Sequence, residues 1–265
     1  MNVLFLGDVF GKPGREILIQ HLVDLRNEFN IDFCIANGEN VAQGRGITRK
    51  TAKALFENGI DAFTSGNHLW DQKESIDFLE SESRILKPVN FPLKAKGNDY
   101  LILKKNDMKL AVFSLIGQAF MGPANSPFEV IDKYLEEVQA ETNCILVDIH
   151  AEATGEKRAL GFYLNGRVSA VLGTHTHIQT ADEEILSAGT AYITDVGMTG
   201  PHDSVIGVKK EIILEKILSG MPIRHEISHS GLQINAVFIE IDHCSGKSVR
   251  IERIKRKING QDIDS

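Results

Sequence analysis

The sequence is poor in cysteine and in long apolar runs. Its three cysteines, Cys34, Cys144 and Cys244, are far apart and not in CxxC spacing. They predict neither a disulfide framework nor a cysteine metal site, and we expect reduced thiols. No run approaches the length of a membrane span, and the opening MNVLFLGDVFGKPGRE lacks the basic and apolar regions of a signal peptide. We therefore expect a cytoplasmic protein without a membrane segment.

Positive charge is not in excess either. The formal net charge is -7, with 29 Lys and Arg against 36 Asp and Glu. This argues against sequence-independent binding to long nucleic acids, which requires a basic surface. A small anionic substrate is compatible with the acidic chain, because a local metal site can override the global sign. The 265 residues show no repeat or linker, so we expect a single domain, 1–265.

Short apolar runs alternate with helical patterns along the chain. Strands are predicted at 2–9, 32–40 and 61–68, with helices at 13–29 and 48–59 between them. This βαβαβ order predicts a parallel sheet with right-handed crossovers. The later segments comprise a hairpin at 99–117, strands at 144–152, 167–177 and 189–200, helices at 126–142 and 208–220, and a second hairpin at 231–257. A two-sheet α/β domain accounts best for this order.

Polar side chains recur where the predicted strands end. They are Asp8, Glu39, Asn40, Asn67, His68, His150, His175 and His177. The carboxyl ends of parallel strands are where sites assemble in α/β sheets. Each residue alone also has a structural interpretation, as a turn residue, a cap or a hydrogen-bonded core histidine. Recurrence at five or six strand ends favours one shared metal site.

These residue types indicate which metals would bind. Imidazole and carboxylate ligands suit zinc, iron or manganese, and the candidates are too many for one tetrahedral ion. We expect two ions bridged by Glu39, with His175 and His177 projecting to the same face because residues two apart on a strand do so. Two divalent ions and two carboxylates leave a charge of about +2, which attracts an anion and lowers the pKa of a bound water. Such a site suits in-line attack on phosphorus.

Six motifs carry a resemblance to a known family over nearly the whole chain. They are GDVFGKPGR, NGENVAQGRGIT, SGNHLWDQKE, DIHAEATGEKRALG, GTHTHIQTADEEIL and YITDVGMTGPHDSVIG. Together they resemble the YmdB-like branch of the calcineurin-like metallophosphoesterases, which are bacterial cyclic-nucleotide phosphodiesterases. The resemblance implies a four-layer αββα sandwich of two mixed sheets flanked by helices. It also implies two metal ions, iron foremost, with manganese, zinc or magnesium as alternatives.

The resemblance also implies a role for each motif residue. Asp8, Glu39, Asn40 and His177 would hold the first metal, and Glu39, Asn67, His150 and His175 the second. Glu39 would bridge them, and His68 would donate a proton. Two positions depart from the broad superfamily: Asp8-Val9-Phe10 lacks the histidine of an Asp-x-His motif, and Gly38-Glu39 replaces Gly-Asp. The YmdB-like branch shares both changes, so they favour the narrower assignment.

The resemblance implies that 2',3'-cyclic nucleotides, and more slowly 3',5'-cyclic ones, are hydrolysed. A metal-bound hydroxide would attack phosphorus, and His68 would protonate the departing ribose oxygen. Arg15, Arg45 and His202 are candidates for substrate contacts, although solvated loop residues explain them equally well. The alternatives are a regulatory protein that binds a nucleotide or a partner around a structural metal site, a phosphomonoesterase, and a nuclease. Assembly into a homo-oligomer is left open.

Overall fold

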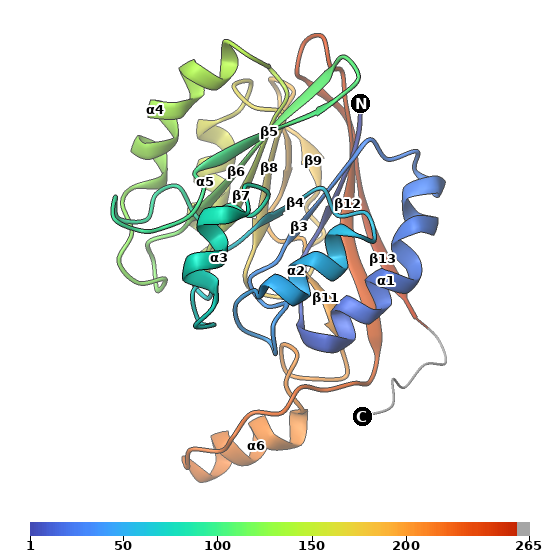
Figure 1. The fold of residues 1–265 in the computed structure, drawn as a ribbon, viewed down its shortest axis with the longest axis vertical. Coiled ribbons are helices and arrows are strands. Elements are labelled where there is room, and N and C mark those ends of the chain that lie inside the picture. The colour runs from blue at the N-terminus through green and yellow to red at the C-terminus, as the bar shows by residue number, and fades with distance from the viewer. Residues whose placement is uncertain (259–265) are drawn as a thin grey trace.

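Two stacked β-sheets form the centre of the computed structural model, which describes residues 1–258 (Figure 1). The first sheet contains β1 (Asn2–Leu6), β2 (Asp8–Val9), β3 (Phe33–Asn37), β4 (Ala62–Thr64), β11 (Met198–Pro201), β12 (Leu232–Ile241) and β13 (Ser248–Lys257). Its order is β2-β11-β12-β1-β3-β4, with β13 paired to β12. Strands β1, β3 and β4 are parallel, as the βαβαβ pattern predicts, whereas β12 is antiparallel to β1.

The second sheet is built from the middle of the chain. It contains β5 (Tyr100–Lys105), β6 (Met108–Ile116), β7 (Ile145–His150), β8 (Ala170–Thr174), β9 (Glu184–Ile185) and β10 (Ala191–Ile193), in the order β5-β6-β7-β8-β10-β9. Strands β6, β7, β8 and β10 are parallel, and the hairpin β5–β6 and the pair β9–β10 are antiparallel. Both sheets are therefore mixed, and both predicted hairpins, β5–β6 and β12–β13, are confirmed.

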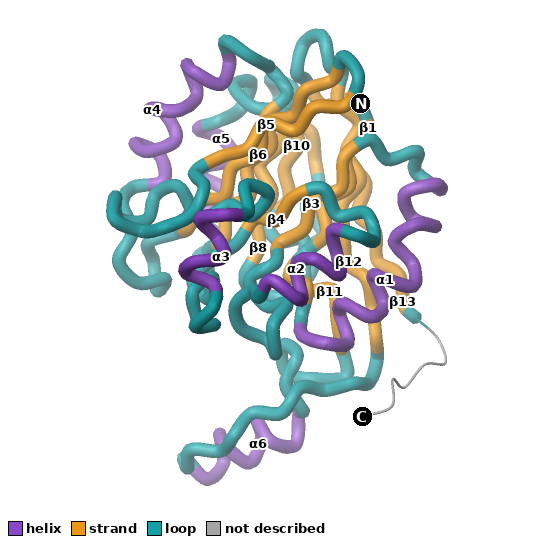
Figure 2. Tube along the Cα trace, in the orientation of Figure 1, coloured by secondary structure: helices purple, strands orange, loops and turns teal. Residues whose placement is uncertain are grey.

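Helices cover the outer face of each sheet (Figure 2). They are α1 (Gly11–Glu28), α2 (Arg49–Phe56) and α3 (Ser75–Ser81) on the first sheet, and α4 (Pro127–Gln139) and α5 (Thr154–Tyr163) on the second. Strand β1 is apolar from Val3 to Leu6 because both of its faces are buried. Leu4 and Leu6 pack toward the helices, whereas Val3 and Phe5 pack against the second sheet. The predicted four-layer αββα sandwich is confirmed.

One predicted strand is wrong. We expected a single strand over 189–200, but the chain forms two strands in two different sheets. Strand β10 lies in the second sheet and β11 in the first, and Gly197, with φ 83°, lies between them. A side chain cannot replace this glycine, because its Cβ would lie 2.6 Å from Asn235 Nδ2 and 2.8 Å from the backbone nitrogen of Gln179. The chain therefore changes sheets beside the ends of β2 and β8.

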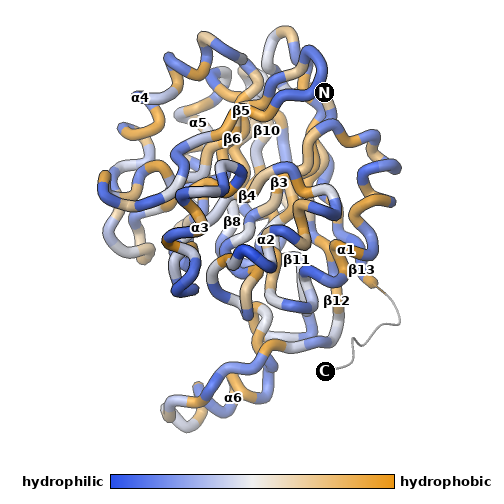
Figure 3. Tube along the Cα trace, viewed as in Figure 1, coloured by the Kyte–Doolittle hydropathy of each residue, from blue (hydrophilic) through white to orange (hydrophobic). Residues whose placement is uncertain are grey.

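The last helix, α6 (Lys210–Ser219), projects away from the sandwich at the base of Figure 1. None of its residues is buried, and Ile217 and Leu218 are 72% and 85% exposed. Figure 3 shows hydrophobic residues along this projecting helix. The predicted helix at 208–220 is thus confirmed, but it covers neither sheet. Within residues 1–258, each helix is too short or too polar to span a bilayer.

Candidate metal centre

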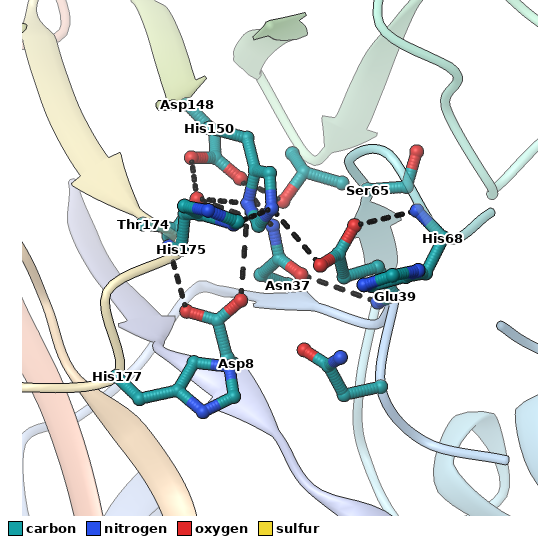
Figure 4. Close-up of polar contacts among 12 residues, drawn as sticks. Asp8, Asn37, Glu39, Ser65, His68, Asp148, His150, Thr174, His175 and His177 are labelled. Atoms are coloured by element: carbon teal, nitrogen blue, oxygen red, sulfur yellow. Dashed lines mark hydrogen bonds and ion pairs between the residues drawn. The ribbon is translucent and has the colours of Figure 1, made fainter. Parts of the chain in front are cut away.

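The predicted site lies where strands of both sheets end (Figure 4). Asp8 begins β2 directly after β1, and Glu39 follows β3. His150 is the last residue of β7 in the second sheet, and His175 follows β8. The carboxyl edges of the two sheets meet here, so residues far apart in sequence become neighbours. All of these side chains except His175 are almost completely buried.

Three side chains form what we call the His150 group: Glu39, His150 and His175. His150 Nε2 lies 2.9 Å from Glu39 Oε1 and 3.0 Å from His175 Nδ1. One ligand atom of each residue lies within 4.8 Å of the others. Metal–ligand bonds of about 2 Å place neighbouring donor atoms about 3 Å apart around one ion. The spacing therefore suits a shared metal ion.

A buried hydrogen-bond chain holds His150 from behind. His150 Nδ1 lies 2.8 Å from Thr174 Oγ1, and that hydroxyl donates to Asp148 Oδ1 at 2.7 Å. Asn37 and Thr64 donate to the other oxygen of Asp148. Because the Thr174 hydrogen is used by Asp148, the Thr174 oxygen accepts the proton of His150 Nδ1. This leaves Nε2 with its lone pair facing Glu39 and His175, as a metal ligand requires.

Gly66 lets strand β4 approach this group closely. A Cβ at Gly66 would lie 2.1 Å from His150 Cδ2 and 2.3 Å from Glu39 Oε2. The same carboxylate oxygen accepts a hydrogen bond from the backbone nitrogen of His68 at 3.1 Å. Only glycine therefore fits between the Glu39 carboxylate and the chain that carries Asn67 and His68.

We call the other residues predicted for the first metal, Asp8, Asn40 and His177, the His177 group. Asp8 Oδ2 accepts a hydrogen bond from the His175 backbone nitrogen, and Asn40 Nδ2 donates to the Gly44 carbonyl. His177 Nδ1 donates to the Ile206 carbonyl at 3.1 Å, which leaves Nε2 as the ligand nitrogen.

Three side-chain oxygens of predicted metal ligands are buried without a hydrogen-bond partner among residues 1–258. They are Asp8 Oδ1, Asn40 Oδ1 and Asn67 Oδ1. Buried polar atoms are seldom left unpaired in native proteins, because an unsatisfied group costs about 1–3 kcal/mol. All three belong to residues predicted to bind metal. Together with the carboxylate and imidazole donors, these oxygens fit divalent cations as the missing partners.

Burial and mutual charge determine the ionisation of the site. Burial, reinforced by Asp195 and Glu39, raises the pKa of Asp8 to about 8 although His150 opposes the shift. Burial disfavours charge on Glu39 and His150 too, but their attraction lowers the pKa of Glu39 to about 2 and raises that of His150 to about 9. A metal ion would compete with the His150 proton, because imidazole binds metal only when neutral.

The backbone aims the last two histidines differently from our expectation. Strand β8 ends at Thr174, so strand alternation does not place His175 and His177. Both residues have left-handed backbones, with φ 100° and 67°. Side chains rarely adopt this region, and such residues cluster at functional sites. A strained turn, rather than an extended strand, brings the two imidazoles into the site.

Comparison with known proteins agrees with this geometry. The sequence model of the "YmdB-like protein" family matches residues 4–254. The chain belongs to the YmdB-like family. A protein of Bacillus subtilis (strain 168) named 2',3'-cyclic-nucleotide 2'-phosphodiesterase is 44% identical over 254 residues, which cover 96% of each chain.

Two solved structures extend the YmdB-like likeness to three dimensions. A hypothetical protein from Thermus thermophilus is 40% identical, with a TM-score of 0.91 over 97% of this chain and 99% of its own. A protein of Mycoplasma pneumoniae described as a novel phosphatase is 34% identical, with a TM-score of 0.90 over 97% and 93% of the two chains. The predicted resemblance to the YmdB-like branch is therefore confirmed.

His68 lies beside the two groups. Its Nδ1 is 2.9 Å from Asp71 Oδ2, and its Nε2 is 3.1 Å from the side-chain nitrogen of Asn67. Arg45 Nε lies 3.6 Å from the same Asp71 oxygen, which places this predicted substrate contact near His68. We did not predict Asp71, although its position three residues after His68 in the YmdB-like SGNHLWD motif was a usable signal.

The other two predicted substrate contacts are engaged elsewhere. The Arg15 guanidinium donates to the Val41 carbonyl, so it braces the loop after Asn40. His202 directly follows β11, and its Nε2 lies 2.9 Å from the carbonyl of Met198 in that strand. Sequence reasoning also missed Asp148, whose signal was a carboxylate in the middle of the apolar run CILVDIH. A charged residue inside a buried strand requires polar partners, and here they support His150.

Proposed function

We propose that this YmdB-like protein is a dinuclear metal-dependent phosphodiesterase that hydrolyses 2',3'-cyclic nucleotides, with slower action on 3',5'-cyclic ones. The main support is the close group of Glu39, His150 and His175, together with the buried side-chain oxygens of Asp8, Asn40 and Asn67 that have no hydrogen-bond partner. The name of the Bacillus subtilis relative supports the substrate class. Iron is the first choice of metal, and manganese, zinc and magnesium are the alternatives.

The residues divide into two ligand sets that share one carboxylate. Glu39 would bridge the ions, Asp8, Asn40 and His177 would complete one set, and Asn67, His150 and His175 would complete the other. Two divalent ions would polarise the phosphate oxygens and make a bound water acidic enough to ionise near neutral pH. The two carboxylates leave the loaded site with a charge of about +2, which favours binding of an anionic phosphodiester.

His68 is the proposed proton donor. Asp71 holds its Nδ1, so Nε2 is the nitrogen that faces the ligand residues. To act as an acid, Nε2 carries a proton and turns from the Asn67 amide toward the leaving oxygen. Protonation matters because the released group is a ribose hydroxyl, whose alkoxide is a poor leaving group. Such general acid catalysis contributes about 10²–10⁴-fold.

Arg45 is the proposed substrate contact with the best geometric support. Its side chain is 67% exposed and lies near Asp71, at the outer side of His68. An exposed guanidinium can contact a phosphate oxygen without first breaking a buried interaction. Arg15 and His202 would act by shaping the surrounding loops, since backbone carbonyls already occupy their polar atoms.

A hydrolysis panel tests this function. The purified protein, reconstituted with Fe²⁺ or Mn²⁺, is assayed on 2',3'-cyclic and 3',5'-cyclic nucleotides, nucleoside monophosphates and single-stranded RNA. We expect the fastest turnover on 2',3'-cyclic nucleotides and loss of activity with a chelator. Cleavage of monophosphates alone, or of RNA alone, would replace the proposal by a phosphatase or nuclease. Nucleotide binding without turnover would favour the regulatory alternative.

A further inference from the structure

A buried ion pair lies directly behind the turn that carries His175 and His177. Lys157 is on α5 and Asp195 follows β10, and both side chains are 1% exposed. Lys157 Nζ donates to Asp195 Oδ2 at 2.7 Å. The lysine stem lies against the end of β8, since a Cβ at Gly173 would come within 2.9 Å of Lys157 Cδ. Neither residue belongs to the predicted ligand sets.

Asp195 is bonded to the middle of the histidine turn. The oxygen that accepts from Lys157 also accepts from the Thr176 backbone nitrogen at 3.1 Å and from its hydroxyl at 2.8 Å. The other carboxylate oxygen accepts from the Gly197 nitrogen at 2.8 Å. The Asp195 backbone nitrogen donates to the Thr180 hydroxyl. One residue thus fixes both the middle of the turn and the segment that follows it.

Thr176 separates two residues with left-handed backbones, His175 and His177. Such conformations are strained and persist only when the surroundings impose them. A buried ion pair is also costly, because two charges lose their hydration. In this protein the strained turn and the buried ion pair are in direct contact, because Asp195 bonds both Lys157 and Thr176. The carboxylate supplies the hydrogen bonds that impose the turn, and the lysine supplies the opposite charge that this buried carboxylate requires.

We propose that Lys157 and Asp195 form a positioning pair that holds the His175–Thr176–His177 turn and thereby sets the affinity of both metal ions. His175 belongs to the His150 group and His177 to the His177 group, so one turn controls one ligand in each set. The inference rests on the proposed metal centre. The pair acts through the turn and contacts neither the ions nor the substrate.

The test compares three variants of the full-length protein stripped of metal. Lys157→Met removes the cation while keeping most of the stem, and Thr176→Val removes only the hydroxyl contact with Asp195. Lys87→Met is the matched control, because the Lys87 ammonium is also buried and bonds Asp99, at 2.5 Å. The measurements are Mn²⁺ stoichiometry and dissociation constants by calorimetry, with thermal unfolding of each metal-free protein.

We expect Lys157→Met to weaken binding of both Mn²⁺ ions by about 10–100-fold, the usual effect of losing a group that orients metal ligands. Thr176→Val should weaken both by a smaller factor. Lys87→Met should lower the melting temperature without changing either dissociation constant. Wild-type Mn²⁺ affinities in Thr176→Val and in a folded Lys157→Met would overturn the positioning role alone. If Lys157→Met does not fold, Thr176→Val decides. Failure of the wild-type protein to bind Mn²⁺ would overturn the metal centre itself.

Discussion

The two ligand sets are held in place by different means. In the His150 group, side chains from four strands fix the imidazole through Thr174 and Asp148. In the His177 group, His177 bonds one backbone carbonyl, that of Ile206, and packs edge-on to Phe10 with 5.6 Å between ring centroids. Ile206 lies at the base of the projecting α6 segment and has a left-handed backbone. His150 is therefore held by side chains of the sheets, whereas His177 is held by a loop.

This difference predicts how the two ions behave. A ligand fixed by a buried network loses little freedom when it binds a metal, whereas a loop-held ligand must be ordered first. We therefore expect the ion at the His150 group to bind more tightly than the ion at the His177 group. The variants below test this difference in affinity between the two ions.

Glu39→Gln should have the largest effect because it removes the charge shared by both sets. Loss of one partner of a buried charge pair costs about 3–5 kcal/mol. We expect both ions to bind on the order of 10²–10³-fold more weakly and hydrolysis to fall to background. Asn40→Ala is the comparison, since it should weaken only the ion of the His177 group. Equal losses of the two ions in Asn40→Ala would contradict the division into sets.

His68→Ala should leave both ions bound and slow the chemistry. On a 2',3'-cyclic nucleotide we expect kcat to fall about 10²–10⁴-fold. A substrate with a nitrophenolate leaving group needs little protonation, so its loss should be much smaller. The measurement is kcat on both substrates together with metal content. Equal losses on the two would remove His68 from the acid role.

Asp148→Asn should weaken the tighter ion. One carboxylate oxygen of Asp148 accepts from Asn37 and Thr64, and the other accepts from Thr174. An asparagine has only one oxygen, so its NH₂ group would replace one of these two acceptors. We expect the affinity at the His150 group to fall about 10–100-fold, which would bring the two ions closer in affinity. Mn²⁺ titration measures this, and Asp132→Asn at an exposed pair is the control. If the dissociation constant of the tighter ion is unchanged, the hydrogen bonds of Asp148 do not support His150 as a ligand.

Phe10→Leu should have the smallest effect and act on the other set. The edge-on contact with His177 is worth about 0.5–1.5 kcal/mol, which corresponds to about twofold to tenfold in affinity. We expect only the weaker ion to be affected, so the gap between the two ions should widen. Calorimetric titration resolves both constants. If the tighter ion responds instead, the sets have been assigned in the wrong order.

Local patterns in the sequence were sufficient for a two-sheet α/β domain and for the candidate residues, whereas the four layers were implied by the family resemblance. Strand ends such as Gly38-Glu39-Asn40 and Gly66-Asn67-His68 are visible as polar groups after apolar runs. The helix predicted at 48–59 begins as α2 after Thr48, whose side chain forms a capping box with Thr51. These features depend on neighbours in the chain.

Other features depend on distant contacts and were not predicted. The chain changes sheets at Gly197 because β10 pairs with β8 and β11 pairs with β2. The left-handed turn at His175 is bonded to Asp8 and Asp195. No local pattern encodes these pairings. Asp148 and Asp195 were missed because their partners lie far away in sequence. The exposure of the α6 residues likewise follows from where the chain leaves the sandwich.

Anomalous diffraction from crystals of the Mn²⁺-loaded protein tests the central claim most directly. The account predicts two manganese peaks per chain with the Glu39 carboxylate between them. Asp8, Asn40 and His177 should coordinate one peak, and Asn67, His150 and His175 the other. A single peak, or two peaks that leave either His150 or His177 without a metal contact, would contradict it.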